Sequence, residues 1–333
     1  MVDSVESGKE YDELQAQYAL LTEEIQFLQN SDRIDDLSPR ERFRLKKQIE
    51  SVEEERAALK QQLQALEESS AESTSSDLYP TLLRLGYRQQ IRLFRRTIES
   101  ESVMAFLIHG YPEYGQSWLL NRIVVQYVPY FLTGKIIRVH VSRKVRRNDV
   151  SALWREVAGR VGLRGKQYTP AEIAQQVVQC LETQNVLLVF HEVEELPEAI
   201  LNELVKEFWQ PLVSAVKAIP ASQHQFKLLM FLVDYEGCVG EWEVPFAEKL
   251  DAAWEASVLL KAPIITEFSD GDLLDWIERE YDKLPPALTE KVDDNIQAIL
   301  ADTENGIPEL VLDVICNYCG CDWYEESKKW LNL

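Results

Sequence analysis

Short apolar segments recur at regular intervals after residue 78, and they constrain the fold of this chain more than any other feature. The apolar segments span residues 103–110, 135–141, 185–190, 226–234 and 256–265. Segments with helical spacing lie before and between them, at residues 87–98, 117–127, 149–161, 170–183 and 197–218. Apolar strands separated by helices form parallel sheets that are covered on both faces. We therefore expect an α/β sandwich over residues 78–268, followed by a helical lid over residues 269–333.

Residues 10–68 show a heptad pattern instead, within an N-terminal domain that we place at residues 1–68. Its apolar positions include Leu14, Leu21 and Leu28 in a first helix, and Ile49, Leu59 and Leu63 in a second. Ser38, followed by Pro39 and then Glu41, is a capping box that predicts the start of the second helix. Two helices bury only one seam, so we predict an α-helical coiled-coil hairpin that contacts a protein partner, a second copy of itself, or its own domain.

Two further features of this region concern self-association and the domain boundary. Arg56 occupies a core position of the heptad pattern, which makes a homo-oligomer a reasonable expectation. Residues 69–77 are small and polar and predict a flexible linker before the α/β domain.

Charge is distributed unevenly along the 333 residues, whose net charge is −21. Residues 78–180 carry 16 basic and 6 acidic side chains, whereas residues 181–333 carry 10 basic and 31 acidic ones. The overall charge argues against a protein that coats nucleic acid or membranes, because phosphates repel a polyanion. The positive segment leaves room for a phosphate ligand or an acidic partner.

The chain lacks the patterns typical of membrane or secreted proteins. No apolar run reaches the ~18 residues needed to span a bilayer, and the first residues are acidic and polar. The five cysteines show no spacing typical of a disulfide framework. We expect a soluble, cytoplasmic protein.

The segment after the first expected strand has the frame of a phosphate-binding loop. Gly110 and Gly115 are five residues apart and precede Gln116 and Ser117, with a strand before and a helix after. This is the G-x-x-x-x-G-K-[ST] pattern, in which a lysine neutralises phosphate charge and a hydroxyl holds Mg²⁺. Gln116 replaces the lysine and supplies no charge, so nucleotide affinity and phosphoryl transfer should both fall. The alternative is an ordinary strand-to-helix crossover with incidental glycines.

At the ends of two later expected strands, the residues also differ from those of a nucleotide-hydrolysing P-loop site. In the third expected strand, His191 stands where such enzymes carry a magnesium-associated aspartate, and Glu192 follows it. A neutral histidine does not replace that acid. Asp234 ends the fourth expected strand, where many such ATPases place a γ-phosphate-sensing arginine. We expect its carboxylate to repel a γ-phosphate.

Four segments together resemble the STAND class of signal-transduction P-loop ATPases. They are LGYRQQIRLFRRTIES, the loop HGYPEYGQSWLL, the strand VLLVFHEVEEL and the lid element ENGIPELVLDVI. The departures at Gln116, His191 and Asp234 make the inactive STAND-like domains of bacteria the nearest resemblance. This resemblance implies a P-loop NTPase-like fold and a role in assembling signalling or defence complexes. It also implies that Pro308 lies near the adenine of a bound nucleotide. Trp118 adjoins the same loop, although packing is its simpler role.

Two other clusters need separate interpretations. Cys316, Cys319 and Cys321 have a metal-like spacing without an evident fourth ligand, so we expect no metal site. The basic clusters are Arg88, Arg92, Arg95 and Arg96 before the first strand, and Arg143, Lys144, Arg146 and Arg147 after the second. These side chains could face acidic residues within the fold, an acidic protein, or, less favourably, nucleic acid.

The sequence supports three hypotheses for function. The first is a non-enzymatic adaptor or regulatory scaffold that has no cofactor and recruits a protein through its hairpin. The second is a switch that binds ATP or ADP without efficient hydrolysis. The third is a nucleic-acid-associated regulator that uses the basic clusters.

Overall fold

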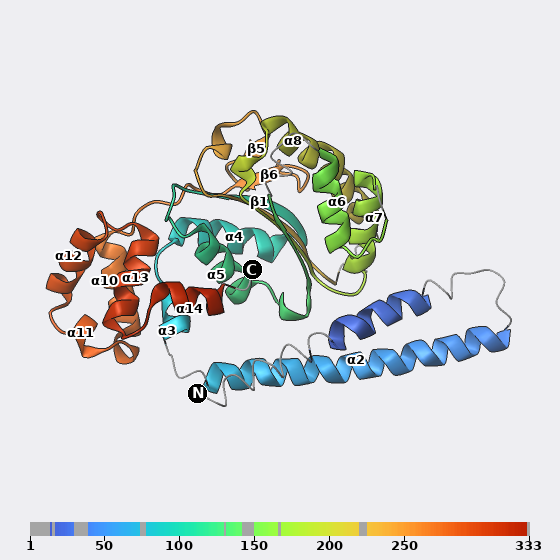
Figure 1. Ribbon diagram of the computed structural model, residues 1–333, viewed down its shortest axis with the longest axis horizontal. Coiled ribbons are helices and arrows are strands. Elements are labelled where there is room, and N and C mark those ends of the chain that lie inside the picture. Colours follow the sequence, from blue (N-terminus) through green and yellow to red (C-terminus); the bar gives the residue numbers. More distant parts are fainter. Residues whose placement is uncertain are drawn as a thin grey trace. The chain divides into compact units, whose positions relative to one another are not determined.

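The computed structural model describes residues 14, 17–29, 39–73, 78–129, 131–141, 150–165, 168–219 and 225–331. The chain divides into two compact units, Met1–Asp77 and Leu78–Leu333, which we describe separately. Figure 1 shows the helices and strands of both units.

The described part of the N-terminal unit consists of a helix at residues 17–29 and of α2, Pro39–Ser73. Tyr18 is buried, which raises its pKa, and the charge of Arg56 on α2 lowers that pKa. The two helices therefore lie together as a hairpin, whereas heptad packing between them stays a prediction. Among the expected seam residues, Leu63 is buried, and Leu14, Leu21, Leu28, Ile49 and Leu59 are only half-buried.

Helix α2 is longer than the sequence pattern indicates. It continues to Ser73, so residues 69–73 of the expected linker are helical. Serine, alanine and glutamate are compatible with a helix when no glycine or proline interrupts it. Ser38 of the expected capping box and residues 74–77 lie outside the described residues.

The second unit is built, in its described residues, on an all-parallel six-stranded sheet in the order β2-β3-β4-β1-β6-β5. Its strands are β1 (Val103–His109), β2 (Lys135–His140), β3 (Val186–His191), β4 (Leu228–Asp234), β5 (Phe246–Ala247) and β6 (Leu259–Lys261). The expected α/β fold class is confirmed. The strand expected at 256–265 pairs only over Leu259–Lys261, and β5 was not expected, because two residues give no periodic signal.

Helices cover both faces of the sheet, with a hydrophobic core on each side (Figure 1). One face carries α4 (Arg88–Ser100) and α5 (Gln116–Tyr127); the other carries α6 (Val150–Arg160), α7 (Pro170–Leu181), α8 (Glu198–Glu203) and α9 (Gln210–Lys217). Successive β1 residues alternate between the cores, since Phe106 belongs to the first and Leu107 to the second. The helix expected at 197–218 contains a π-helical turn at Leu204–Trp209, between α8 and α9.

The last part of the chain is helical, as expected, and we call it the lid. It comprises α10 (Asp270–Glu280), α11 (Pro286–Thr289), α12 (Val292–Asp302), α13 (Pro308–Tyr318) and α14 (Trp323–Trp330). A capping box between Ser269 and Asp272 starts α10. Buried residues of α10, α12 and α13 join the same core as α4 and α5, so the lid is continuous with one face of the sandwich.

A cluster of aromatic rings attaches α14 to the sandwich. The Trp118 ring lies 5.1 Å from that of Trp323 and 6.0 Å from that of Trp330, measured between centroids. Tyr79 of the short helix α3 (Leu78–Leu82) completes the cluster at 5.2 Å from Trp330. Trp118 therefore packs against the lid, which agrees with the packing role expected from the sequence.

In the described part of the chain, no helix combines the length and apolar character that crossing a membrane requires. The free thiols are Cys180, Cys238, Cys316, Cys319 and Cys321. Burial raises the pKa of Cys319 to about 11, which keeps this thiol protonated at neutral pH.

Replacement of Trp323 by alanine should destabilise the second unit by about 3 to 5 kcal/mol, because this residue is only 3% exposed in the aromatic cluster. The neighbouring Tyr324 is 54% exposed, so Tyr324→Ala should change the free energy of unfolding by less than about 1 kcal/mol. Urea denaturation of both variants measures the difference. Equal losses would contradict the docking role of Trp323.

Candidate functional site

The glycine loop follows β1 and starts helix α5, as the phosphate-loop frame requires. Gly115 immediately precedes α5 with a φ of 72°, in the left-handed region that favours glycine. β1 lies between β4 and β6, whereas the chain continues from β1 to β2 at the edge of the sheet. Ligands of open parallel sheets bind at the carboxyl ends of strands near such a change of direction. The loop is therefore the position at which to look for a binding site.

Gln116 fills the interior of its own loop. Its side-chain Nε2 donates hydrogen bonds to the carbonyl oxygens of Gly110 at 2.7 Å and Tyr111 at 2.9 Å, and approaches that of Asp234 at 3.4 Å. The residue is only 1% exposed. Its amide protons hold the loop together and are not directed at a ligand.

Ser117 also has a partner within the protein. Its hydroxyl lies 2.8 Å from the hydroxyl of Tyr235, which in turn lies 2.8 Å from Nδ1 of His191. The hydroxyl that would hold Mg²⁺ in a phosphate-binding loop is therefore joined to the residue at the aspartate position. The structure brings Ser117 and His191 to one site, but a tyrosine connects them.

His191 is uncharged at neutral pH. Burial lowers its pKa to about 4, and the charges of His140 and Arg138 contribute to the decrease. The His140 ring is stacked on it, with centroids 4.6 Å apart. Such a neutral imidazole gives Mg²⁺ none of the attraction of a carboxylate. Glu192 follows with a φ of 59° and lies within electrostatic range of Tyr235.

Asp234 has a different role from the one expected at the end of β4. We predicted a carboxylate that faces a γ-phosphate, but the residue is fully buried and its carboxylate accepts backbone hydrogen bonds. The donors are the N–H groups of Glu236, Gly237 and Val239, at 2.8 to 3.0 Å. Asp234 therefore stabilises the turn after β4.

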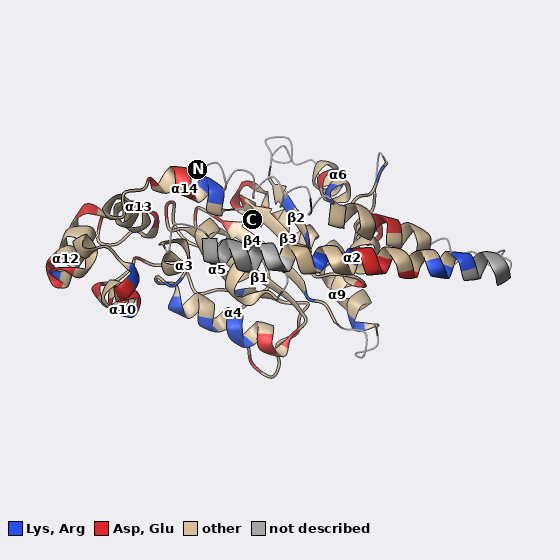
Figure 2. Ribbon diagram, turned by 90° about the horizontal axis from the view of Figure 1, so that it is seen from below, with Lys and Arg blue, Asp and Glu red and all other residues tan. Residues whose placement is uncertain are grey.

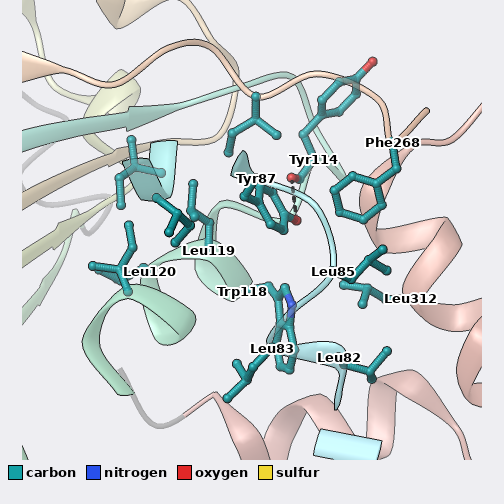
Figure 3. Packing of buried hydrophobic residues seen from close by; sticks show 14 of the residues in the cluster. Leu82, Leu83, Leu85, Tyr87, Tyr114, Trp118, Leu119, Leu120, Phe268 and Leu312 are labelled. Atoms are coloured by element: carbon teal, nitrogen blue, oxygen red, sulfur yellow. Dashed lines mark hydrogen bonds between the residues drawn. The ribbon is translucent and has the colours of Figure 1, made fainter. Parts of the chain in front are cut away.

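Tyr87 closes another side of the loop, as Figure 3 shows. Its hydroxyl donates to the carbonyl oxygen of Tyr114 at 3.2 Å, and a Cβ atom at Gly115 would lie only 2.2 Å from that hydroxyl. The Phe268 ring packs edge-on against Tyr87 at 5.1 Å. The buried guanidinium of Arg122 donates to the carbonyl oxygens of the two residues before Tyr87, at 2.7 and 2.9 Å. Position 115 requires glycine because the tyrosine occupies the adjacent space.

The lid contacts the same loop directly. The backbone N–H of Glu309, at the start of α13, donates to the carbonyl oxygen of Glu113 at 3.0 Å. Pro308 is buried beside Gly115, since its Cβ lies 3.7 Å from the place where a Cβ of Gly115 would be. The proline of the GxP element thus lies beside the glycine loop.

Ion pairs join the lid to the segment before β1. Arg84 pairs with the buried Glu280 at 2.7 Å, and Arg88 pairs with Asp272 at 3.3 Å and also with Asp275. For Arg88, the intramolecular interpretation of the basic cluster is confirmed. The other arginines of this cluster, Arg92, Arg95 and Arg96, are exposed. Figure 2 marks the basic positions of α4 in blue along its ribbon. Arg143, Lys144, Arg146 and Arg147 lie outside the described residues.

The surroundings of the loop are acidic. Burial raises the pKa of Glu309, and the nearby charge of Glu113 raises it further. A hydrogen bond to the Glu267 carboxylate raises the pKa of the Tyr114 hydroxyl to about 12. These like charges oppose the approach of a triphosphate.

Sequence reasoning missed Tyr87, Tyr235 and Arg122 as parts of this site. Tyr87 lies within a segment that carries the STAND resemblance, but nothing in a single sequence shows that its ring faces Gly115. Tyr235 directly follows Asp234, and this position after a strand was the available signal. Within the described ranges, no group of three or more histidine, cysteine or acidic side chains could hold a metal ion.

Comparison with protein families gives a match over the centre of the chain. Residues 82–233 match the family described as inactive STAND, and the match covers the glycine loop, β1, β2, β3 and nearly all of β4. Comparison with curated proteins gives no match.

Gly115→Ala should destabilise the second unit by about 2 kcal/mol or more, because the new Cβ would be forced against Tyr87 in a left-handed conformation. Gly320 has a φ of 74° and nothing within 4 Å of a Cβ, so Gly320→Ala isolates the conformational cost alone, about 1 kcal/mol. In a Tyr87→Phe background, the cost of Gly115→Ala should fall toward that of Gly320→Ala. Chemical denaturation measures all four variants, and an unchanged cost would contradict the contact.

Stability should fall between about pH 6.5 and pH 4 because of His191. In this range the unfolded chain binds a proton at the imidazole, whereas the folded chain keeps it neutral until its pKa of about 4. The expected loss is roughly 2 to 3 kcal/mol. Urea denaturation of wild type and His191→Asn across this range tests it, since the variant lacks this titration and should lose correspondingly less. Parallel curves would contradict the low pKa.

Proposed function

We propose that this chain, whose residues 82–233 form an inactive STAND-like domain, is a catalytically inactive adaptor or regulatory scaffold. The observation that carries the proposal is Gln116, whose amide donates to the carbonyls of its own loop and is 1% exposed. A lysine at this position would bring the charge that a β/γ-phosphate needs. The glutamine instead completes the loop with neutral hydrogen bonds from the protein itself.

The residues at the positions that hold Mg²⁺ in P-loop enzymes support the same proposal. Ser117 is bonded to Tyr235, and His191 is neutral, so neither supplies the hydroxyl and carboxylate pair that positions Mg²⁺ in P-loop enzymes. Recovering activity would require several coordinated substitutions and not one. On this proposal the protein is not an ATPase.

The lid supports a scaffold and not a nucleotide-driven motor. Its position relies on protein groups: the Glu309–Glu113 hydrogen bond, the Arg84–Glu280 ion pair and the tryptophan cluster. A conformation held by these contacts does not need ATP to complete it. The N-terminal hairpin would then recruit a protein partner in bacterial signalling or defence, in the cytoplasm, as the STAND resemblance implies.

A nucleotide-binding switch is the second candidate. It is favoured by the retained loop backbone, with Gly110 and Gly115 before the N-terminus of α5, where backbone N–H groups favour anions. Tyr87 and Pro308 beside the loop, and the acidic surroundings, weigh against it.

ATP or ADP with Mg²⁺ should leave the unfolding temperature of the full chain unchanged within about 1 °C. A ligand at about 1 mM with a dissociation constant of about 1 mM would add only ~0.4 kcal/mol of stability. Differential scanning fluorimetry and calorimetry measure the effect, with Ser117→Ala as the matched variant. Gln116→Lys alone should not produce ATP hydrolysis, because His191 and Tyr235 remain in place. Micromolar binding by the wild type that Ser117→Ala weakens would favour the switch instead.

A further inference from the structure

Helix α4 carries its positive charges on one side. At 3.6 residues per turn, its exposed basic residues lie within an arc of about 100° around the helix axis. We call them the arginine stripe: Arg88, Arg92, Arg95 and Arg96. The opposite side of α4 is buried in the sandwich and carries Gln90, Ile91, Phe94, Thr97 and Ile98. The stripe is therefore the solvent-facing side of a helix whose other side is fixed in the core.

The described part of the chain neutralises only part of this stripe. Arg88 pairs with two aspartates of α10, and Arg95 approaches Glu99 at 3.9 Å. Arg92 and Arg96 are exposed, and no acidic side chain in the described part of the chain forms an ion pair with either of them. Two adjacent guanidinium groups on one helix face are therefore left for an external anion.

The stripe does not stabilise α4 itself. Arg92 is four residues from both Arg88 and Arg96, and like charges at this spacing destabilise a helix. The first turn starts with Arg88 and has no acidic residue, although the helix dipole favours negative charge there. The acidic residue of α4, Glu99, lies at its other end, where the dipole favours positive charge. These charges reduce the stability of the helix, which indicates that their role lies outside it.

The surroundings of the stripe favour a short acidic segment over a nucleic acid. Residues 269–333 of the lid carry 16 acidic and 5 basic side chains, and α10 of the lid meets the stripe at Arg88. Glu99, whose side chain is 70% exposed, lies at the other end. A phosphate backbone that continued past either end would meet these carboxylates and be repelled. A protein segment can end within the ~20 Å length of α4.

An acidic helix matches the stripe in spacing as well as in charge. Carboxylates four residues apart on one helix face recur every ~6 Å along its axis, as Arg92 and Arg96 do on α4. Guanidinium groups bind carboxylates through two parallel hydrogen bonds. Ile264, which is 38% exposed, is held against α4 because its carbonyl oxygen accepts a hydrogen bond from Gln90 at 3.1 Å. An exposed apolar side chain beside the charges also favours a protein partner, which has apolar side chains to cover it.

We propose that the arginine stripe of α4 binds an acidic α-helical segment of a partner protein, with Arg92 and Arg96 each paired with a carboxylate of that segment. Arg88 contributes less, because the aspartates of α10 already neutralise it. The inference goes beyond the proposed scaffold function, in which the N-terminal hairpin recruits the partner. It places a second recruiting surface on the second unit, and it does not depend on what the hairpin binds.

Binding of a designed acidic helix to the full chain tests the proposal. The probe is a fluorescein-labelled, hydrocarbon-stapled, alanine-rich peptide of about 20 residues, whose glutamates alternate three and four residues apart and so share one face. Fluorescence anisotropy at about 0.1 M salt, where the Debye length of about 10 Å screens the acidic remainder of the chain, should show saturable binding. A peptide of the same composition with glutamates spread around the helix should bind at least about threefold more weakly.

Charge reversal at two positions locates the binding site. Arg92→Glu with Arg96→Glu should weaken binding about tenfold or more, because attraction becomes repulsion at both positions. The free energy of unfolding should not fall, since the same substitutions remove the repulsion along α4. Arg155→Glu with Lys217→Glu is the matched control, because these exposed residues lie on α6 and α9, which cover the other face of the sheet. The control should bind the probe like wild type.

Two further variants test the contact itself. Glu99→Gln should strengthen binding about twofold, because Glu99 competes with the probe for Arg95. Arg92→Lys keeps the positive charge and introduces an amine, which a carbodiimide couples to a carboxylate that lies against it. Mass spectrometry of the digested product should find the probe attached at position 92. Arg155→Lys, treated in the same way, should carry no probe at position 155.

Every outcome counts for or against the proposal. No binding up to about 1 mM probe, or binding that the double variant retains, would overturn it. Tighter binding of a DNA duplex of about 20 base pairs, lost in the double variant, would instead assign the stripe to nucleic acid. Light scattering tests self-association: a wild-type dimer that the double variant converts to the mass of one chain would assign the stripe to a second copy. Nucleotide binding, measured in the same samples, tests the scaffold function separately, because none of these substitutions touches the glycine loop.

Discussion

The carboxyl ends of β1, β3 and β4 meet at one edge of the parallel sheet, and this constraint determines what the rest of the second unit can do. His109, His191 and Asp234 end these three strands, with His109 paired in register with Asp234. The polar groups that follow parallel strands must find partners in this confined region. In a nucleotide-binding protein, phosphate and metal satisfy them.

In this chain, most of these partners come from the protein itself. Gln116 donates to loop carbonyls, Tyr235 contacts both Ser117 and Nδ1 of His191, and backbone N–H groups after β4 donate to Asp234. Nε2 of His191 and Nδ1 of His109 are buried without a hydrogen-bond partner in the described part of the chain. Each residue that departs from the P-loop pattern is nevertheless accompanied by a hydrogen bond to a nearby group of the same chain. The departures at Gln116, His191 and Asp234 lie close together, and each has at least one hydrogen bond within the protein.

The sequence was sufficient for the class of fold but not for the contacts that close the site. Apolar segments long enough to show a pattern, such as 103–110, became strands, whereas the two residues of β5 could not be recognised. The loop and the proline of the lid were recognised because their spacing is local. Tyr87 could not be placed, because its contact with Gly115 depends on a left-handed backbone at Tyr87 and on Arg122 from another helix.

Asp234 shows a second kind of limit. Its position at the end of a strand was predicted correctly, but its carboxylate turns toward the chain that follows it, as short acidic side chains do in turns. Local hydrogen bonding of this type depends on the backbone path after the strand. A single sequence does not reveal that path.

The lid contacts have a thermodynamic consequence for any regulation of this protein. An ATP-driven switch opens and closes because hydrolysis changes the ligand that bridges loop and lid. Here the Glu309–Glu113 hydrogen bond and the Arg84–Glu280 ion pair belong to the chain, and no reaction consumes them. If the lid moves, the free energy for that movement must come from the binding of another molecule with higher affinity for the open form. For the scaffold proposed above, the extent of lid opening would then follow the concentration of that partner, and closure would require the partner to dissociate.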